Sequence, residues 1–197
     1  MKFLLVAFSL ALTALTTSLA ADDQPARPNI LFLFADDQRA DTIAALGNPV
    51  IKTPNLDRLV HSGVSFNRAY MQGGFNGATC VPSRAMLLSG QNLFHIDEKL
   101  MRSETWPEAF ARAGYTTFIS GKWHNGETSF VRAFPDARSV FFGGMADHTR
   151  VPVANVTGGK VGNRHTAAKF SSEEFADAAI GFIESHKNEQ PFFCYVA

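Results

Sequence analysis

The chain has 197 residues, of which 46% are hydrophobic, 12% aromatic and 18% charged; this balance is typical of a globular protein and excludes a disordered or collagen-like chain. Its 18 Lys and Arg residues cancel its 18 Asp and Glu residues, so no net field attracts nucleic acid or an acidic membrane, and we expect no nucleic-acid partner. Any anion that this protein binds must therefore be held by a local site.

Residues 1–20 predict a secretory signal peptide. One basic residue, Lys2, precedes an apolar run that ends in the small residues of positions 18–20. This pattern predicts cleavage near Ala20 or Ala21, and therefore a secreted or periplasmic protein. An uncleaved membrane anchor is the alternative, which the short run and its interruption by Ser and Thr disfavour. No later stretch is apolar enough to predict a stable membrane span.

The rest of the chain predicts alternating strands and helices. The first strand is a continuous apolar run, as expected of a strand buried on both faces. Strands are predicted over residues 29–35, 64–70, 115–119 and 191–197. Helices are predicted over residues 54–62, 82–88, 105–113 and 171–183. Residues 125–165 have no clear period and are predicted to form long loops. The pattern predicts an α/β fold, a mostly parallel sheet with helices on both faces.

In such sheets the chemistry gathers at the carboxyl ends of the strands, and three clusters of residues follow predicted strands or open a helix. The first cluster is Asp36 and Asp37, directly after the first strand. Two adjacent carboxylates at the end of a buried strand repel each other and lose hydration, so something must compensate them. A divalent cation with oxygen ligands would do so. An acidic turn without a metal is the alternative.

The second cluster runs from Cys80 to Arg84, between a glycine-rich loop and a predicted helix. Pro82 pre-sets the first helical turn, which places Cys80 at a helix N-terminus, where free N–H groups favour an anion. Arg84 lies one helical turn further on the same face, and its planar guanidinium suits a tetrahedral oxyanion. A thiol in this position can be a nucleophile of low pKa. A buried structural cysteine beside a surface arginine is the alternative.

The third cluster is the stretch from Gly121 to His124, just past the strand predicted over residues 115–119. Lys122 and His124 lie on either side of Trp123, so an extended backbone would direct both toward one face. A cation and a titratable imidazole together can hold an anion and move a proton. A solvated strand end is the alternative interpretation.

Taken together, the three clusters closely resemble the sulfatase family. The most specific element is the stretch CVPSRAMLLSG of residues 80–90, which is similar to the active-site signature of that family. The resemblance covers residues 28–125 in order and continues through the helix and strand of residues 170–197. It implies an alkaline-phosphatase-like fold. Family members run on to a further His, an Asp-Asn pair and another Lys, so we expect residues 28–197 to be the amino-terminal portion of a truncated catalytic domain.

The resemblance also implies a cofactor and a metal. In the family the signature cysteine is oxidised to formylglycine, so Cys80 would be modified by a formylglycine-generating enzyme. One hydroxyl of the hydrated aldehyde would attack sulfur, and the other would then expel sulfate. Asp36, Asp37 and the modified Cys80 would hold one calcium ion, which neutralises sulfate charge.

Three further residues receive roles from the resemblance. Arg84 would orient the hydrated aldehyde, Lys122 would bind both sulfate and nucleophile, and His124 would help to remove the proton of the nucleophile. The implied protein is a sulfuric ester hydrolase acting on a sulfated small molecule or polysaccharide. A phosphate or phosphonate monoester hydrolase of the same superfamily and an inactive truncated product or binding module are the alternatives. Sugar, aryl and choline sulfates all stay open as substrates.

Overall fold

The computed structural model describes residues 27–186 and 190–197, so the predicted signal peptide lies outside the described residues. The strands are β1 (Ile30–Leu33), β2 (Thr116–Lys122), β3 (Ala137–Phe141), β4 (Pro152–Thr157), β5 (Lys160–Val161), β6 (His165–Thr166) and β7 (Phe192–Val196). The helices are the 3-10 turn η1 (Ala44–Leu46) and the α-helices α2 (Pro54–Ser62), α3 (Cys80–Ser89), α4 (Trp106–Arg112), α5 (Glu127–Ala133) and α6 (Ser171–Ser185).

The sheet has the strand order β1-β7-β2-β3-β4-β5, and β6 pairs with β4. Strands β1, β7, β2 and β3 run parallel, whereas β4 and β5 are antiparallel additions. Leu33 and Ser120 both pair with Val196, so the carboxyl ends of β1, β2 and β7 meet at one edge of the sheet. This edge is where the predicted clusters should converge.

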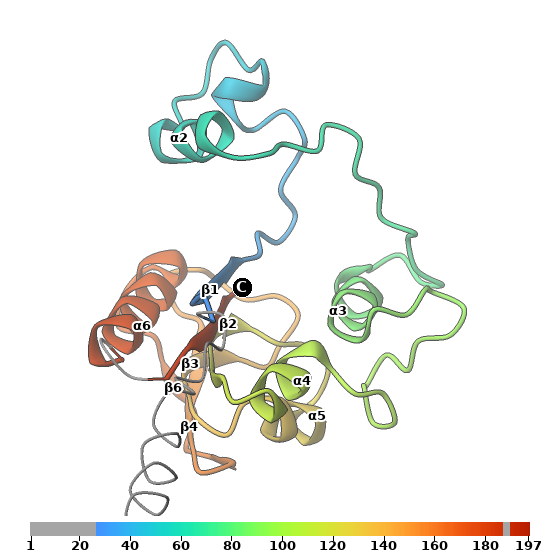
Figure 1. The fold of residues 1–197 in the computed structure, drawn as a ribbon, viewed down its shortest axis with the longest axis vertical. Helices are drawn as coiled ribbons and strands as arrows, with labels where there is room; N and C mark the ends of the chain where they lie inside the picture. Colours follow the sequence, from blue (N-terminus) through green and yellow to red (C-terminus); the bar gives the residue numbers. More distant parts are fainter. Residues whose placement is uncertain (1–26, 187–189) are drawn as a thin grey trace, which may run out of the picture.

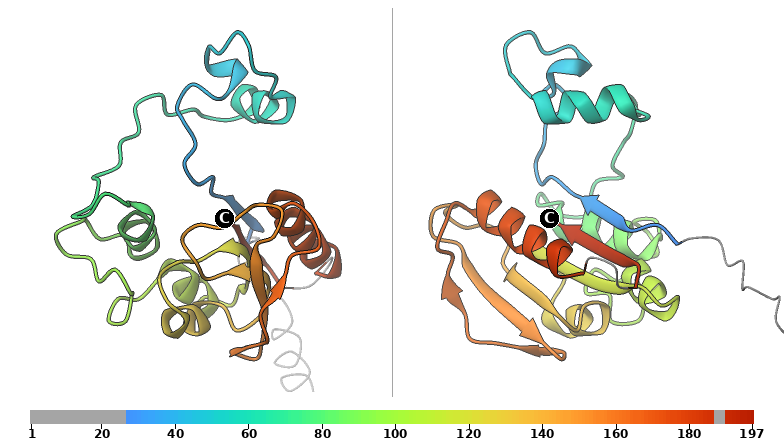
Figure 2. Two further views of the ribbon diagram at one scale, coloured as in Figure 1. Left: turned by 180° about the vertical axis from the view of Figure 1, so that it is seen from behind. Right: turned by 60° about the vertical axis from the view of Figure 1, so that its left-hand side comes forward.

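Helices cover both faces of the sheet, which confirms the predicted fold class (Figures 1 and 2). Helix α6 packs against β2, β3 and β7 on one face, and α4 packs on β2 from the other. The two cores take alternate residues of β7, because neighbouring side chains of a strand point to opposite faces. Phe192 and Cys194 lie in the α6 core, and Phe193 and Tyr195 lie in the larger core with α3, α4 and α5.

Strand β1 is buried less than predicted. Its side chains alternate between half-buried and exposed, and Leu31 and Leu33 are 50% and 58% exposed. The prediction of a strand buried on both faces was therefore wrong for one face. The reason is position: among the described residues β1 lies at the sheet edge, and α6 packs on β7, β2 and β3 instead.

Residues 36–79 lead from the end of β1 to the start of α3, and η1 and α2 stand away from the other elements (Figures 1 and 2). Thr53 directly precedes α2, and its hydroxyl donates to Asp57 Oδ1 at 2.7 Å and accepts the Ala44 N–H at 2.9 Å. Asp57 Oδ1 in turn accepts the Ala45 N–H at 2.9 Å. Side chains thus tie η1 to the first turn of α2.

The strand predicted over residues 64–70 is absent from the structure. This segment has no strand partner among the described residues, and its alternating apolar side chains are exposed, with Phe66 at 83% and Tyr70 at 87%. The alternation was present, but a strand also needs an edge to pair with, and this segment lies in the excursion away from the sheet.

The ends of α3, α4 and α6 lie within two residues of the predicted ones. Helix α3 begins at Cys80, two residues before the predicted start, and ends at Gly90 with a φ of 68°. Helix α4 has the predicted start, because Glu108 Oε2 accepts the Thr105 N–H at 2.9 Å and the Thr105 hydroxyl at 2.7 Å. Helix α6 begins at Ser171, the first residue of the helix predicted over residues 171–183, and ends two residues later than predicted.

The prediction of long loops over residues 125–165 was wrong, since α5, β3, β4, β5 and part of β6 lie there. Helix α5 spans only seven residues, and β5 and β6 two residues each, too few to show a period. Strands β3 and β4 are mostly buried, and they pair with each other across a gap in the sequence, as in Val140 of β3 opposite Ala154 of β4. No helix among the described residues is long and apolar enough to cross a bilayer.

Candidate active site

Asp36 brings the three clusters together at the carboxyl edge of the sheet. Its Oδ2 lies 2.5 Å from Lys122 Nζ and 3.6 Å from Arg84 Nη2. Its Oδ1 accepts the thiol of Cys80, with the sulfur at 3.8 Å. The structure therefore gathers a carboxylate after β1, a thiol and a guanidinium from α3, and an amine from the end of β2.

The electrostatics of Asp36 differ from the expectation drawn from the sequence. Burial raises the pKa of Asp36, but the hydrogen bond and charge of Lys122, together with the charge of Arg84, outweigh it, so the pKa lies below its usual 3.8. The compensation that the paired carboxylates require is thus supplied in part by cations of the chain itself. The carboxylate is ionised at neutral pH and holds Lys122 in place.

Arg84 is a buried cation with a fixed orientation. Its side chain is 1% exposed and lies over the ring of Phe34, 5.1 Å from the centroid. Its Nη1 donates to the Lys122 carbonyl at 2.7 Å and to the Tyr195 hydroxyl at 3.2 Å. Its Nε and Nη2 have no hydrogen-bond partner in the described part of the chain. Since a guanidinium stays charged in proteins, these groups form a desolvated positive site.

Gly121 positions Lys122 by allowing β2 and the end of β7 to approach closely. Its φ is 106°, and a Cβ here would lie 1.8 Å from the Ala197 carbonyl oxygen. That oxygen accepts the Lys122 N–H at 2.9 Å, and Ala197 N–H donates to the Ser120 carbonyl at 3.1 Å. Lys122 is 8% exposed, so its ammonium group faces Asp36 from a largely dry strand end.

The backbone conformation of His124 differs from the prediction. The backbone is not extended, because β2 ends at Lys122 and His124 has a φ of 66°. Between them Trp123 turns into the core, fully buried, and its indole N–H donates to the Gly126 carbonyl at 2.7 Å. The expectation that Lys122 and His124 share one face of a strand was therefore wrong in its geometry.

His124 nevertheless lies within the field of the site. Burial first, and then the positive charges of Lys122 and Arg84, hold the pKa of His124 below its usual 6.5. The ring fits beside Gly144, where a Cβ would lie 2.6 Å from its Cε1 and Nε2 atoms. Its Nδ1 is buried without a hydrogen-bond partner among the described residues. A neutral imidazole of this kind can accept a proton.

The candidate metal ligands also cluster. One atom each from Asp36, Asp37 and Cys80 lie within 4.8 Å of one another, and both carboxylates are exposed. Carboxylate oxygens are the ligands that Ca²⁺ and Mg²⁺ prefer, although Ca²⁺ takes about six to eight of them. The two carboxylates suit a hard divalent cation and would supply part of its coordination shell, whereas the unmodified Cys80 thiol is a soft donor that suits such a cation less well.

Two residues of this region were missed by the sequence predictions. Tyr195 orients Arg84, and burial raises the pKa of its hydroxyl to about 12. A tyrosine in a buried, phenylalanine-rich strand was a usable signal, because its hydroxyl needs a polar partner. Asn125 donates to backbone carbonyls near α3, and it fell in the segment predicted as loop. No sequence signal pointed to it.

Cys80 and Cys194 are both free thiols. Cys194 is fully buried in β7, where burial raises its thiol pKa to about 12. Cys80 is half-buried at the first residue of α3, beside Asp36. The two thiols therefore differ in access, and only Cys80 opens onto the site.

Comparisons with known proteins give a consistent result. The chain is similar to an N-acetylglucosamine-6-O-sulfatase of Bacteroides thetaiotaomicron, with 29% identity over 93% of this chain and 33% of the relative. A solved complex of a protein with its substrate D-glucosamine-2-N,6-O-disulfate is 26% identical, with a TM-score of 0.69 over 87% of this chain and 34% of the other.

A phosphonate monoester hydrolase of Agrobacterium radiobacter shares the fold, with a TM-score of 0.55 at 22% identity over 86% of this chain and 40% of that one. The chain thus spans about a third of the length of the first two proteins. Residues 28–197 match the sequence pattern of the family described as Sulfatase. The matched range includes all three clusters and the strand β7. The chain belongs to the sulfatase family.

Proposed function

We propose that this protein hydrolyses sulfate esters with a formylglycine formed from Cys80. The observation that carries the proposal is the convergence of Lys122, Arg84 and Cys80 on the carboxylate of Asp36. A site with two buried cations around one reactive side chain suits a tetrahedral anion, because the charges are fixed before the anion arrives. Membership of the sulfatase family supports the same conclusion.

Lys122 and Arg84 would bind the sulfate group. The ammonium of Lys122 is already held by a carboxylate oxygen of Asp36 at 2.5 Å, so it can donate its remaining N–H groups to a sulfate oxygen. Arg84 Nη2, which has no hydrogen-bond partner among the described residues, would orient the hydroxyls at position 80. Both cations lie in a largely dry environment, where electrostatic stabilisation is stronger than in water.

His124 would accept the proton of the nucleophilic hydroxyl. Its lowered pKa keeps the imidazole neutral near pH 7, which leaves one ring nitrogen with a free lone pair. The hydrated aldehyde at residue 80 would supply the nucleophile when that modification is present. Proton removal by His124 and charge binding by Lys122 are then separate roles, and they predict separate kinetic effects.

Asp36, Asp37 and residue 80 would hold a calcium ion, which would supply further positive charge for the sulfate group. This assignment rests on the oxygen donors and their mutual distances. Further ligands would come from outside this cluster, since two carboxylates and one side chain at position 80 do not complete a calcium shell.

The substrate class that we propose is a sulfated carbohydrate, either a small sugar sulfate or a sulfated polysaccharide. Support comes from the name of the Bacteroides relative and from the sugar disulfate in the solved complex. A formylglycine-generating enzyme would act on the chain before folding. Export by the predicted signal peptide would place the protein outside the cell or in the periplasm. Phosphonate or phosphate ester hydrolysis is the second candidate, favoured by the Agrobacterium neighbour.

The test uses the full product of the gene that encodes these residues, produced in a host that contains formylglycine-generating enzyme. Mass spectrometry of the tryptic peptide with residue 80 is expected to show loss of sulfur and two hydrogens and gain of one oxygen. Hydrolysis of N-acetylglucosamine 6-sulfate and an aryl sulfate is then compared with that of an aryl phosphate. A chain of 197 residues, assayed in parallel, reports whether this part alone turns over.

The matched control pair is Cys80→Ala and Cys194→Ala. Cys80→Ala is expected to abolish hydrolysis, whereas Cys194→Ala leaves it intact because Cys194 lies in the α6 core. Full activity with an unmodified Cys80 would refute the formylglycine mechanism. Faster hydrolysis of the phosphate than of either sulfate would favour the second candidate.

A further inference from the structure

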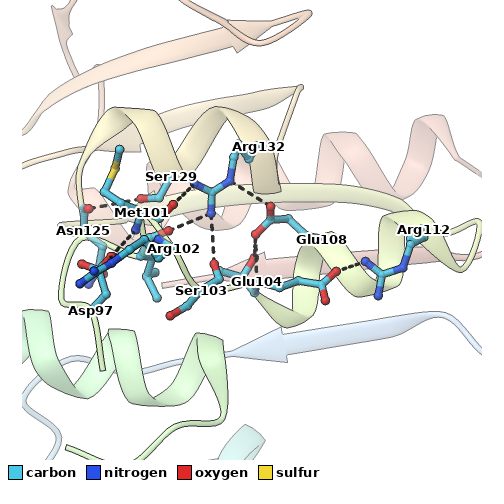
Figure 3. Close-up of polar contacts among 12 residues, drawn as sticks. Asp97, Met101, Arg102, Ser103, Glu104, Glu108, Arg112, Asn125, Ser129 and Arg132 are labelled. Carbon is cyan, nitrogen blue, oxygen red and sulfur yellow. Dashed lines mark hydrogen bonds and ion pairs between the residues drawn. The ribbon is translucent and has the colours of Figure 1, made fainter. Parts of the chain in front are cut away.

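Asn125 is a fully buried amide in the turn between β2 and α5. Its Nδ2 donates one hydrogen to the Val81 carbonyl at 3.0 Å and the other to the Glu98 carbonyl at 2.7 Å. Its Oδ1 has no hydrogen-bond partner among the described residues, so the donors and not the acceptor fix this side chain. Figure 3 shows Asn125 beside Ser129 and the loop that begins at Asp97.

The loop that Asn125 contacts is held by several hydrogen bonds. The carboxylate of Asp97 accepts three backbone N–H groups of its own loop, at 2.9 to 3.1 Å. From α5, Arg132 donates to the carbonyls of Leu100 at 2.8 Å and Ser103 at 3.2 Å (Figure 3). The Glu98 carbonyl is therefore a fixed acceptor, and the hydrogen bond to it anchors the Asn125 amide.

The hydrogen bond to the Val81 carbonyl links two candidate catalytic residues, Cys80 and His124, through the backbone. Val81 follows Cys80 in the first turn of α3, and Asn125 follows His124. The amide thus joins the turn that carries Cys80 to the turn that carries His124. His124 has a φ of 66°, a left-handed conformation that is unfavourable for a residue with a side chain and persists only where its surroundings hold it. The neighbouring Asn125 amide is one such restraint.

We propose that Asn125 is a positioning residue, which keeps the first turn of α3 at a fixed distance from His124. The kinetic part of this inference rests on the proposed sulfatase function, whereas the structural part does not. Without the amide, the loop and the turn lose their link to the Val81 carbonyl. A misplacement of about 1 Å between reacting groups can cost on the order of 100-fold in rate, so the effect should appear in kcat.

The variant is Asn125→Leu, which has a similar shape without hydrogen-bond donors. Its matched control is Ser129→Ala, because Ser129 is also fully buried and its hydroxyl donates to the carbonyls of Asn125 and Gly126, both at 3.2 Å. Ser129 therefore stabilises the same turn through hydrogen bonds within it, whereas Asn125 also bonds to α3. Asn125→Ser, which retains one donor, is a second variant in case Asn125→Leu does not fold.

The first measurement is amide hydrogen exchange of residues 80–89, followed by mass spectrometry on the chain of 197 residues. Faster exchange is expected in Asn125→Leu and not in Ser129→Ala. This result needs no catalytic activity, so it tests the structural role of Asn125 separately from the proposed function. Unchanged exchange in Asn125→Leu and Asn125→Ser would overturn the inference even if the protein is a sulfatase.

The second measurement is steady-state kinetics of the natural gene product on a sulfate ester. We expect kcat of Asn125→Leu to fall about 100-fold with a much smaller change in KM, and Asn125→Ser to lie between it and the wild type. Ser129→Ala is expected to retain nearly wild-type kcat. Equal losses of kcat in Asn125→Leu and Ser129→Ala would mean that Asn125 only stabilises the turn, and this would refute its positioning role.

Discussion

Gly121 and Gly181 provide a sharp test of the packing at the carboxyl edge of the sheet. Gly121→Ala would place a Cβ 1.8 Å from the Ala197 carbonyl oxygen, at a φ of 106°, whereas a Cβ at Gly181 in α6 meets nothing within 4 Å. The same added methyl group therefore meets a backbone atom in one variant and open space in the other. The two variants are expected to change stability in opposite directions.

The magnitude follows from the contacts that Gly121→Ala breaks. The backbone conformation at this position costs a residue with a Cβ about 1–3 kcal/mol. Displacement of Ala197 also breaks its hydrogen bonds to the Lys122 N–H and the Ser120 carbonyl, which contribute about 1 kcal/mol each. We expect a loss of roughly 3–5 kcal/mol in unfolding free energy. Gly181→Ala, in a helix interior, should gain about 0.5–1 kcal/mol.

The assay is urea unfolding of the chain of 197 residues, followed by circular dichroism at 222 nm in the wild type and both variants. The slope m is compared first, because a changed slope would signal a changed unfolded state or an intermediate. A loss below about 1 kcal/mol in Gly121→Ala, or a comparable loss in Gly181→Ala, would refute the close approach of β2 and β7 at this point.

Asp36→Asn should destabilise the folded chain at pH 7, because Lys122 and Arg84 lose their counter-ion. Since the pKa of Asp36 is lowered from 3.8, this loss is present above about pH 4 and disappears as the pH falls through the native pKa, so urea curves at pH 7 and pH 3 should differ. Lys122→Ala should raise KM and lower kcat for a sulfate ester, whereas His124→Ala should lower mainly kcat; wild-type kinetics in both would contradict their roles. Cys194→Ala should lower the unfolding free energy by about 1 kcal/mol without affecting hydrolysis, as urea curves and rates can check.

The parts of the fold that the sequence predicts are those with local signals. Thr105 and Glu108 form a capping box at the start of α4, and the apolar run of residues 29–35 indicates β1. Strand pairing is different, because it depends on partners far away in the chain. Strands β3 and β4 lie in a segment without a clear period, and the alternating residues 64–70 form no strand because they lie away from the sheet.

The candidate site shows the same division. Asp36, Cys80 and Lys122 were grouped from their positions after strands or at a helix start, and the structure brings them together. The left-handed backbone of His124 could not be derived from alternation, because the strand ends at Lys122 and the φ of His124 is 66°. Asn125 binds carbonyl groups 27 and 44 residues away, so its role depends wholly on the tertiary fold.

The exposed side chains of β1 affect how the isolated chain would behave in solution. Among the described residues β1 pairs only with β7, so the backbone groups on its other side are left for solvent or for another strand. A strand with one unpaired edge, and with Leu31 and Leu33 half-exposed, is a template for the addition of a strand from a second molecule. The weight-average mass of the chain, measured by light scattering, should therefore rise with protein concentration. Rates or unfolding curves are comparable only at concentrations below that rise.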